Sequence, residues 1–241
     1  MELMKYITAS KNAVNKGYQG LEKALMTYDE ALEALRQKAD TMSEKAVNDE
    51  HRALNEQLDA AITAARDLMN AEIAKQRDGF TAEVMEYYRP DGSKIDQNDI
   101  AVLNAGFPLR DDEVFDLIVK HQENNTMLRS IYAYIKQNRM TGRVPTQLLR
   151  ACMRAERGGE AETKIFDRFI HLATMGFAHP DRHYTMYQAN LDEYETETEL
   201  KLLKTVPYTS AEIQAKIDQI EREQMQKRND TRAKLKLDAF H

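Results

Sequence analysis

The fold of this 241-residue chain follows from residues 14–46, VNKGYQGLEKALMTYDEALEALRQKADTMSEKA. Apolar residues recur here at alternating spacings of four and three, which keeps one side of an α-helix against a second helix. Ala24, Ala31 and Ala34 widen the apolar stripe, and charged or amide side chains fill most other positions. The pattern predicts a coiled-coil seam formed by Val14, Tyr18, Leu21, Leu25, Tyr28, Leu32, Leu35, Ala39, Met42 and Ala46.

Two interpretations of this first arm are open. No Gly or Pro occurs between Gly20 and Gly79, which would permit one helix of roughly 85 Å at 1.5 Å per residue. However, Thr41-Met-Ser-Glu44 has the form of a capping box, which begins a new helix, and the apolar stripe slips by one residue just after it. A turn at this point would explain both features. The sequence therefore favours a hairpin with arms at residues 2–39 and 44 to about 76.

The composition predicts an all-α protein. Charged residues make up 31% of the chain, while only 9 Gly and 5 Pro are present, as in helix-rich proteins rather than β-sandwiches or disordered linkers. Changes in the apolar pattern and in turn-forming residues divide the chain into four parts. We expect a coiled-coil extension at 1–79, a linker at 80–97, a compact helical domain at 98–177 and a C-terminal helical arm at 178–241.

Short helices with clear capping and breaking residues are predicted for the later parts. Pro90-Asp-Gly92 is turn chemistry, and the residues before it fit either a β-hairpin or a helix followed by a loop. Five helices make up the compact domain, and two more make up the arm, where Pro207 separates them. The expected helices are residues 100–104, 114–121, 126–137, 146–157, about 160–175, about 182–204 and 211 to about 235.

No stretch of the sequence carries a convincing catalytic or cofactor signature. His179-Pro-Asp-Arg-His183 resembles a metal cluster, but proline interrupts its helical spacing and no paired cysteines accompany it. Gly158-Gly159 lacks the rest of a phosphate-binding loop, and the acids at 192–199 fit a solvated helix face. Cys152, the one cysteine, is expected to be a buried apolar group. We therefore predict no enzyme activity, catalytic residues, cofactor or metal.

The most informative charge feature is residues 136–157. Six basic residues and one acid lie here, in a chain whose formal net charge is −6. Such a patch can bind an acidic protein surface or a phosphate backbone, and it can also pair with Asp111, Asp112 or the acids at 192–199 of the same molecule. Four of the arginines would share a face if their helix began one turn before residue 146. The candidate partner-binding residues are Arg139, Arg143, Arg150, Arg154 and Arg157, together with Leu21, Leu25, Leu32 and Leu35 of the seam.

Two segments resemble parts of uncharacterised helical proteins encoded in the structural gene clusters of tailed phages and prophages. One is residues 35–66, a coiled-coil break followed by a Glu/Ala/Arg-rich helix. The other is residues 111–134, DDEVFDLIVKHQENNTMLRSIYAY. The resemblance covers about a third of the chain and brings no catalytic residues with it. It implies a role in virion assembly, as a scaffolding-like or minor structural protein.

The sequence thus predicts a non-enzymatic protein that acts by coiled-coil self-association and by binding protein partners, among them virion proteins. Two other functions stay open: a phage-encoded inhibitor of a host nucleic-acid machine, and a nucleic-acid-binding protein that uses the basic block. The N-terminal residues lack the basic region and apolar run of a signal peptide. We therefore expect a protein of the host cytoplasm or the virion that is not secreted and does not enter membranes.

Overall fold

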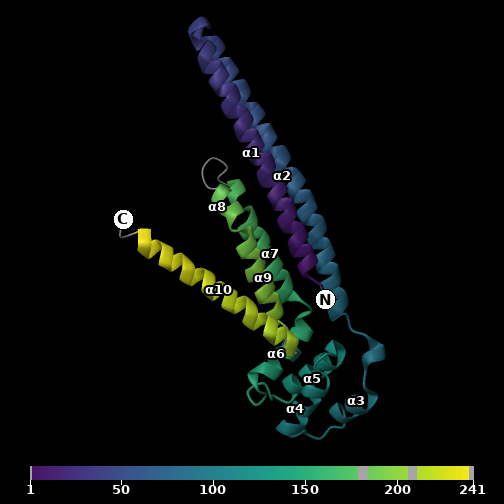
Figure 1. The fold of residues 1–241 in the computed structure, drawn as a ribbon. Coiled ribbons are helices and arrows are strands. Elements are labelled where there is room, and N and C mark those ends of the chain that lie inside the picture. The colour runs from purple at the N-terminus through teal and green to yellow at the C-terminus, as the bar shows by residue number, and fades with distance from the viewer. Residues whose placement is uncertain (1, 179–183, 206–210, 239–241) are drawn as a thin grey trace. The chain divides into compact units, whose positions relative to one another are not determined.

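The structure is a computed structural model that describes residues 2–178, 184–205 and 211–238. Every regular element in these residues is a helix, which confirms the predicted all-α class (Figure 1). The helices are α1 (Met4–Lys38), η1 (Ala39–Thr41), α2 (Glu44–Tyr88), η2 (Gly92–Lys94), α3 (Gln97–Leu103), α4 (Asp111–Lys120), α5 (Asn125–Gln137), α6 (Thr146–Arg157), α7 (Glu160–Thr174), η3 (Met175–Ala178), α8 (Tyr184–Ala189), α9 (Leu191–Thr205) and α10 (Ala211–Asp238).

The chain divides into two compact units, each made of segments that are distant in sequence. We call Glu2–Thr81 with Phe166–Glu195 the hairpin unit, and Ala82–Ile165 with Thr196–His241 the basic unit. The predicted division into consecutive domains is therefore wrong. Buried residues of α7 beyond Phe166 belong with the N-terminal helices, and sequence periodicity does not say which helices pack together.

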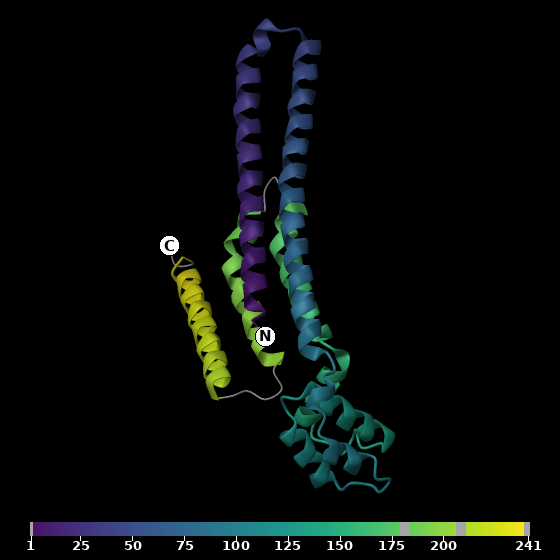
Figure 2. The ribbon, with the colours of Figure 1, turned by 90° about the vertical axis from the view of Figure 1, so that its right-hand side faces the viewer.

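The hairpin interpretation of the N-terminal arm is confirmed. Helices α1 and α2 lie side by side and antiparallel in both views (Figure 1, Figure 2). The turn joins Lys38 to Glu44, as the sequence predicts. The predicted cap is wrong in detail, because the Ser43 hydroxyl accepts the Ala46 amide at 3.3 Å while the Thr41 hydroxyl donates to the Lys38 carbonyl.

The second arm is longer than predicted. Helix α2 continues through Gly79 and ends at Tyr88, where the sequence suggested an end near Gly79 and left a β-hairpin open. A helical glycine costs about 1 kcal/mol relative to alanine. Here the buried residues Phe80, Val84 and Tyr88 recur every four positions, so burial of this face outweighs that cost. The Pro90-Asp-Gly92 turn is confirmed, since the Asp91 carboxylate caps the following turn at Ser93.

Close approach and aromatic packing hold the hairpin unit together. A Cβ on Gly17 would lie 2.9 Å from the Met69 sulfur and 3.0 Å from the Phe177 ring, so a larger residue there would require these side chains to move. The Tyr18 ring stacks on Phe177 with centroids 4.9 Å apart. Its fully buried hydroxyl donates to the Ala173 carbonyl at 2.8 Å and accepts the Gly176 amide at 3.1 Å. Tyr18 thus satisfies two backbone groups where α7 ends.

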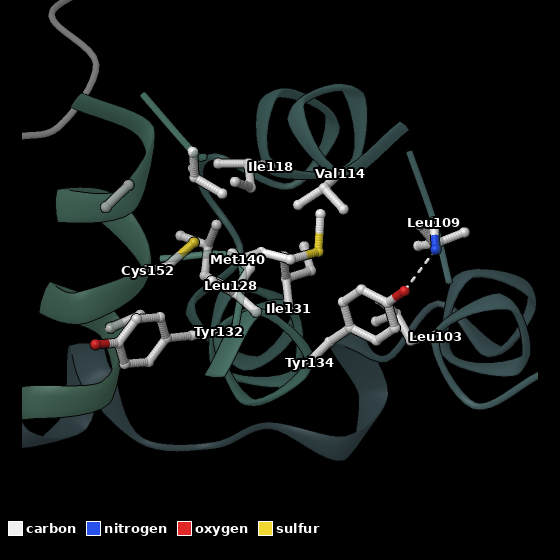
Figure 3. Packing of buried hydrophobic residues seen from close by; sticks show 14 residues of the cluster. Leu103, Leu109, Val114, Ile118, Leu128, Ile131, Tyr132, Tyr134, Met140 and Cys152 are labelled. Carbon is white, nitrogen blue, oxygen red and sulfur yellow. Dashed lines mark hydrogen bonds between the residues drawn. The ribbon is translucent and has the colours of Figure 1, made fainter. Parts of the chain in front are cut away.

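The basic unit has a separate apolar core around α5 (Figure 3). Leu128, Ile131 and Ile135 on α5 are almost completely buried against residues of α4 and α6. The Tyr134 hydroxyl accepts the Leu109 amide at 2.6 Å, which fixes the chain just before α4. Two helix starts in this unit are capped by side chains: Asn124 accepts the Met127 amide at the start of α5, and Asp96 accepts amides of the first turn of α3.

The C-terminal helices also differ from their predicted extents. The expected helix at 182–204 is two helices, α8 and α9, separated at Asn190. The expected last helix is α10, which packs Ile217 and Ile220 against Leu200 of α9. Pro207 and the predicted cap at Thr209 or Ser210 lie outside the described residues. Within the described part of the chain, each helix is too short or too polar to cross a bilayer.

We expect Tyr18→Phe to lower the free energy of unfolding by about 1–3 kcal/mol. The change removes one hydroxyl and leaves two buried backbone groups without this partner. Urea unfolding followed by circular dichroism measures the loss. The control is Tyr28→Phe, whose hydroxyl bonds to Asn55 at an exposed position and should cost less than about 0.5 kcal/mol. Equal losses in the two variants would contradict the role given to Tyr18.

Candidate functional site

A pocket of about 430 Å³ lies within the basic unit, between α6, the Gly158-Gly159 turn, the start of α7 and the end of α9. Its volume is in the range of ligand-binding pockets. We call it the basic pocket, because five of its lining residues are Lys or Arg and two are Glu. The lining residues are Gln147, Arg150, Met153, Arg154, Arg157, Gly159, Glu160, Ala161, Glu162, Lys164, Lys204 and Thr205.

Helical spacing places three of the predicted arginines in this pocket. Arg150, Arg154 and Arg157 follow one another at intervals of four and three along α6, so they share a face. The opposite face of α6 carries Ala151, Cys152 and Ala155, which are buried in the core. The predicted fourth member, Arg143, does not join them. Helix α6 begins at Thr146, so Arg143 stays in the preceding turn.

Two glycines make the sharp connection between α6 and α7. Gly158 ends α6 in the left-handed conformation with φ of 60°, and Gly159 has φ of 87°. A Cβ on Gly159 would lie 2.0 Å from the Val84 side chain and 3.1 Å from the Tyr88 ring. The Gly-Gly pair therefore has a structural role: it turns the chain so that the first turn of α7 faces the last turns of α6.

A buried ion pair forms the inner wall of the pocket. Glu162 on α7 is completely buried and accepts two hydrogen bonds from the Arg154 guanidinium, one of them at 2.8 Å. The same carboxylate oxygen accepts the Tyr88 hydroxyl at 2.8 Å. Burial raises the pKa of that hydroxyl, so Tyr88 is a neutral donor. Arg154 also donates to Thr205 at 2.9 Å, which ties the end of α9 to the pocket.

Most other charges of the pocket are neutralised within the unit. The Lys164 ammonium lies 2.5 Å from Glu160, and the Lys204 ammonium lies 2.6 Å from Glu221 of α10. Arg150 and Arg157 are exposed and form neither a hydrogen bond nor an ion pair with the residues that the structure describes. Lys164 and, to a smaller extent, the charge of Arg157 lower the pKa of Glu160, but Arg157 makes no direct ion pair with it. The pocket therefore presents two guanidinium groups without a direct ion-pair partner, and such groups bind carboxylates or phosphates.

The rest of the predicted basic block is dispersed. Lys136 bonds to Glu156, which raises the pKa of its ammonium, and it lies over the Tyr132 ring. Arg143 pairs with Asp111 at 2.8 Å, which is one of the internal pairings that the sequence suggested. Arg139 is exposed in a turn outside the pocket lining. The block is thus partly neutralised within the unit and partly free.

Four of the acids at 192–199 have ion-pair partners outside this block. In the hairpin unit, Lys11 contacts Asp192 at 2.7 Å and Glu195 at 2.6 Å. In the basic unit, Glu197 pairs with Lys201, and Glu199 pairs with Lys216 of α10. Three of these acids therefore join helices within their own units, which is more than the solvated helix face that the sequence predicted.

The four predicted seam leucines differ in their exposure. Leu21 is completely buried and Leu35 is 5% exposed, so pairing within the hairpin unit already covers both. Leu25 and Leu32 are partly exposed. A groove of about 220 Å³ runs along the same part of the hairpin, and its lining is mostly small or apolar: Gly20, Lys23, Ala24, Thr27, Tyr28, Ala31, Leu54, Gln57, Leu58 and Ala61.

One group of possible metal ligands occurs in the described residues. Oxygen atoms of Asp96 and Asp99 and a ring nitrogen of His121 lie within 4.8 Å of one another. The Lys120 ammonium contacts both carboxylates, at 2.9 and 2.7 Å, and thereby holds the cation position itself. The arrangement is an ion-pair network that joins α3 to the end of α4. The predicted His179–His183 candidate lies outside the described residues.

Sequence reasoning missed several residues of the basic pocket. Glu162 had a usable signal, because a Gly-Gly turn between two helices brings a residue just after the turn close to the last turn before it. Lys204 and Thr205 had none, since they lie about fifty residues further along the chain and reach the pocket only through packing of α9. Comparisons with protein-family models, curated proteins and solved structures give no match to this chain.

We expect Glu162→Gln to lower the free energy of unfolding by about 3–5 kcal/mol, because it leaves the Arg154 guanidinium, 14% exposed, without its carboxylate. Chemical denaturation measures the change. The control is Glu160→Gln, which removes an exposed i, i+4 pair with Lys164 and should cost less than about 1 kcal/mol. A cost for Glu162→Gln as small as that of the control would show that the buried pair does not support this wall.

We expect Cys152 to be unreactive toward thiol reagents in the folded protein. The side chain is fully buried, as the sequence predicted, and burial raises the pKa of its thiol to about 12. At neutral pH the reactive thiolate is then about a thousandfold scarcer than for an ordinary cysteine. Reaction with a chromogenic disulfide, in native buffer and then in denaturant, tests this. Fast reaction in native buffer would contradict the burial.

Proposed function

We propose that this protein is a non-enzymatic assembly protein of the phage type, which acts by helical self-association and by binding the acidic surface of protein partners. A partner in the virion, and a place in the host cytoplasm or the virion, belong to the same proposal. The observation that carries it is the N-terminal hairpin, in which some of the predicted seam side chains are buried and others stay partly exposed.

The hairpin supports self-association because its seam is only partly used within the molecule. Leu25 and Leu32 of α1 and Leu54 and Leu58 of α2 stay partly exposed. Leu54 and Leu58 line a groove together with three alanines, and a further helix could pack closely there, whereas Leu25 and Leu32 lie outside the groove lining. Burial of apolar area contributes about 25 cal/mol per Å². A helix of another molecule that covered the exposed leucines or the groove would therefore stabilise the association.

The basic pocket supports binding of an acidic protein. Arg150 and Arg157 are unpaired, while Met153 and Ala161 give the pocket an apolar part between and beside them. Carboxylate-bearing peptides offer both kinds of contact. The locked Arg154–Glu162 pair and the protonated Cys152 thiol support a binding role over a catalytic one, since neither is placed as a free acid, base or nucleophile.

Nucleic-acid binding is a second candidate, favoured by the same two arginines. Phosphate contacts by Arg150 and Arg157 would give an affinity that falls steeply with salt. Glu160 and Glu162 of the pocket lining are paired with Lys164 and Arg154, so they do not distinguish a carboxylate from a phosphate. Among the described residues the pocket lining has no aromatic side chain on which a base could stack. The lack of a stacking surface in this part of the chain ranks an acidic protein above a nucleic acid.

The double change Leu25→Asp and Leu32→Asp tests the proposal. We expect the wild type to form oligomers whose mass, measured by light scattering, rises with concentration, and we expect the variant to lose mass. Charges at two partly exposed seam positions would have to be buried in any helix–helix contact there. A matched control is Ala53→Asp with Ala60→Asp, which have the same spacing on α2 but are exposed and lie outside the apolar seam.

The melting temperature separates loss of association from loss of the hairpin itself. A variant that melts as the wild type does but has a smaller mass supports association through the seam. Unchanged mass and melting in the Leu25/Leu32 variant, or equal losses of mass in the variant and the control, would contradict it.

A further inference from the structure

An acidic stripe lies on the outer side of α1, next to the seam. Glu22, Met26, Asp29 and Glu33 follow one another at intervals of four, three and four, so they share one face of the helix. Met26 is 58% exposed, although methionine is usually at least partly covered. Glu22 and Asp29 are exposed and make no ion pair with the residues that the structure describes. The stripe therefore places one apolar side chain between two unpaired carboxylates.

The basic pocket shows the same pattern with the opposite charge. Arg150 and Arg157 are seven residues apart on α6, and Met153 lies between them. Glu22 and Asp29 are also seven residues apart, with Met26 between them. Seven helical residues span about 10.5 Å, so the two arginines and the two acids are separated by the same distance along their helices. Charge and spacing thus match between the two surfaces.

We propose that the basic pocket of one molecule binds the acidic stripe of a second copy of this chain. Arg150 and Arg157 pair with Glu22 and Asp29, and Met26 enters the apolar part of the pocket beside Met153. This inference rests on the proposed self-association and names the surfaces that carry it. The contact joins two different surfaces, so it can close reciprocally as a two-fold dimer or continue from molecule to molecule as a ring or an open filament.

Several observations favour this occupant over another acidic protein. The stripe belongs to the same chain and is present at the same concentration as the pocket. Both unpaired arginines and both unpaired acids find partners in one contact, and the exposed Met26 is covered. Lys164, Lys204 and Arg154 of the pocket already have acidic partners within the basic unit. Arg150 and Arg157 are therefore the groups that remain to bind the stripe.

A charge-exchange experiment tests the contact. One variant carries Arg150→Glu with Arg157→Glu, and the other carries Glu22→Arg with Asp29→Arg. Each variant alone sets like charges against each other, so we expect its association to weaken at least about tenfold relative to the wild type. An equal mixture of the two variants restores opposite charges at every contact, so its mass should return to that of the wild type. High salt should weaken the wild-type association.

The matched control reverses Asp49 and Glu56 of α2 to arginine. These exposed acids have the same spacing and the same change in net charge, but they lie outside the stripe. Their reversal should leave the mass nearly unchanged. Circular dichroism and melting report whether each variant folds. A disulfide between chains carrying Met26→Cys and chains carrying Ala161→Cys, formed under mild oxidation and absent when Ala53→Cys replaces Met26→Cys, gives a second readout.

The outcomes distinguish this inference from the wider proposal. Loss in both variants with recovery in their mixture supports the contact. Wild-type oligomers that survive either exchange, or a mixture that does not recover, overturn the contact but leave association through Leu25 and Leu32 in place. A wild type that stays monomeric in low salt at every concentration overturns both. Retention on duplex DNA that needs the two arginines, with no effect of the stripe variant on mass, overturns the contact in favour of nucleic acid.

Discussion

The hairpin unit depends on the close approach of α1 to α2 and α7. Gly17 and Gly20 let the Met69 and Ala65 side chains approach more closely than most Cβ contacts do, and the Tyr18 hydroxyl then satisfies two backbone groups where α7 ends. Along the apolar stripe, Val14, Tyr18 and Leu21 are completely buried, Leu25 and Leu32 are partly exposed, and Leu35 is buried again. Because burial along the stripe is uneven, apolar side chains in the distal part of the hairpin stay accessible to another molecule.

The basic unit depends on a different constraint: a buried carboxylate needs hydrogen-bond donors and an opposite charge beside it. Glu162 is completely buried, and its carboxylate is stable there only because Arg154 and Tyr88 donate to it. Arg154 is thereby withdrawn from the surface, although sequence places it in line with Arg150 and Arg157. Three of the five basic residues in the pocket lining have acidic partners, which leaves Arg150 and Arg157 without a direct ion pair. Two charges at a fixed spacing match fewer partner surfaces than five charges would.

Local patterns in the sequence predicted the parts of the fold that depend on local physics. The hairpin turn after Lys38 and the bounds of α6 follow from periodicity and breaker residues, and the structure confirms them. The assignment of α7 to the hairpin unit depends on which apolar faces meet, which no single helix records. Gly79 shows that a local signal can also mislead. The glycine suggested a helix end, but burial of the face that runs from Phe80 to Tyr88 outweighed the cost of a helical glycine.

In the basic pocket, the positions of the arginines were predictable from the sequence, but the pairing of their charges was not. Arginines at intervals of four and three on one helix had to share a face, so the pocket's charged wall was visible in the sequence. Whether each charge was free depended on distant partners such as Asp111, Glu162 and Glu221. Many acids and bases of the described residues pair within one helical turn or across neighbouring helices, while others remain exposed. Water stabilises an exposed charge, so a lone unpaired charge says little about a partner. An exposed methionine between two such charges says more, because its apolar area is removed from water only when another surface covers it.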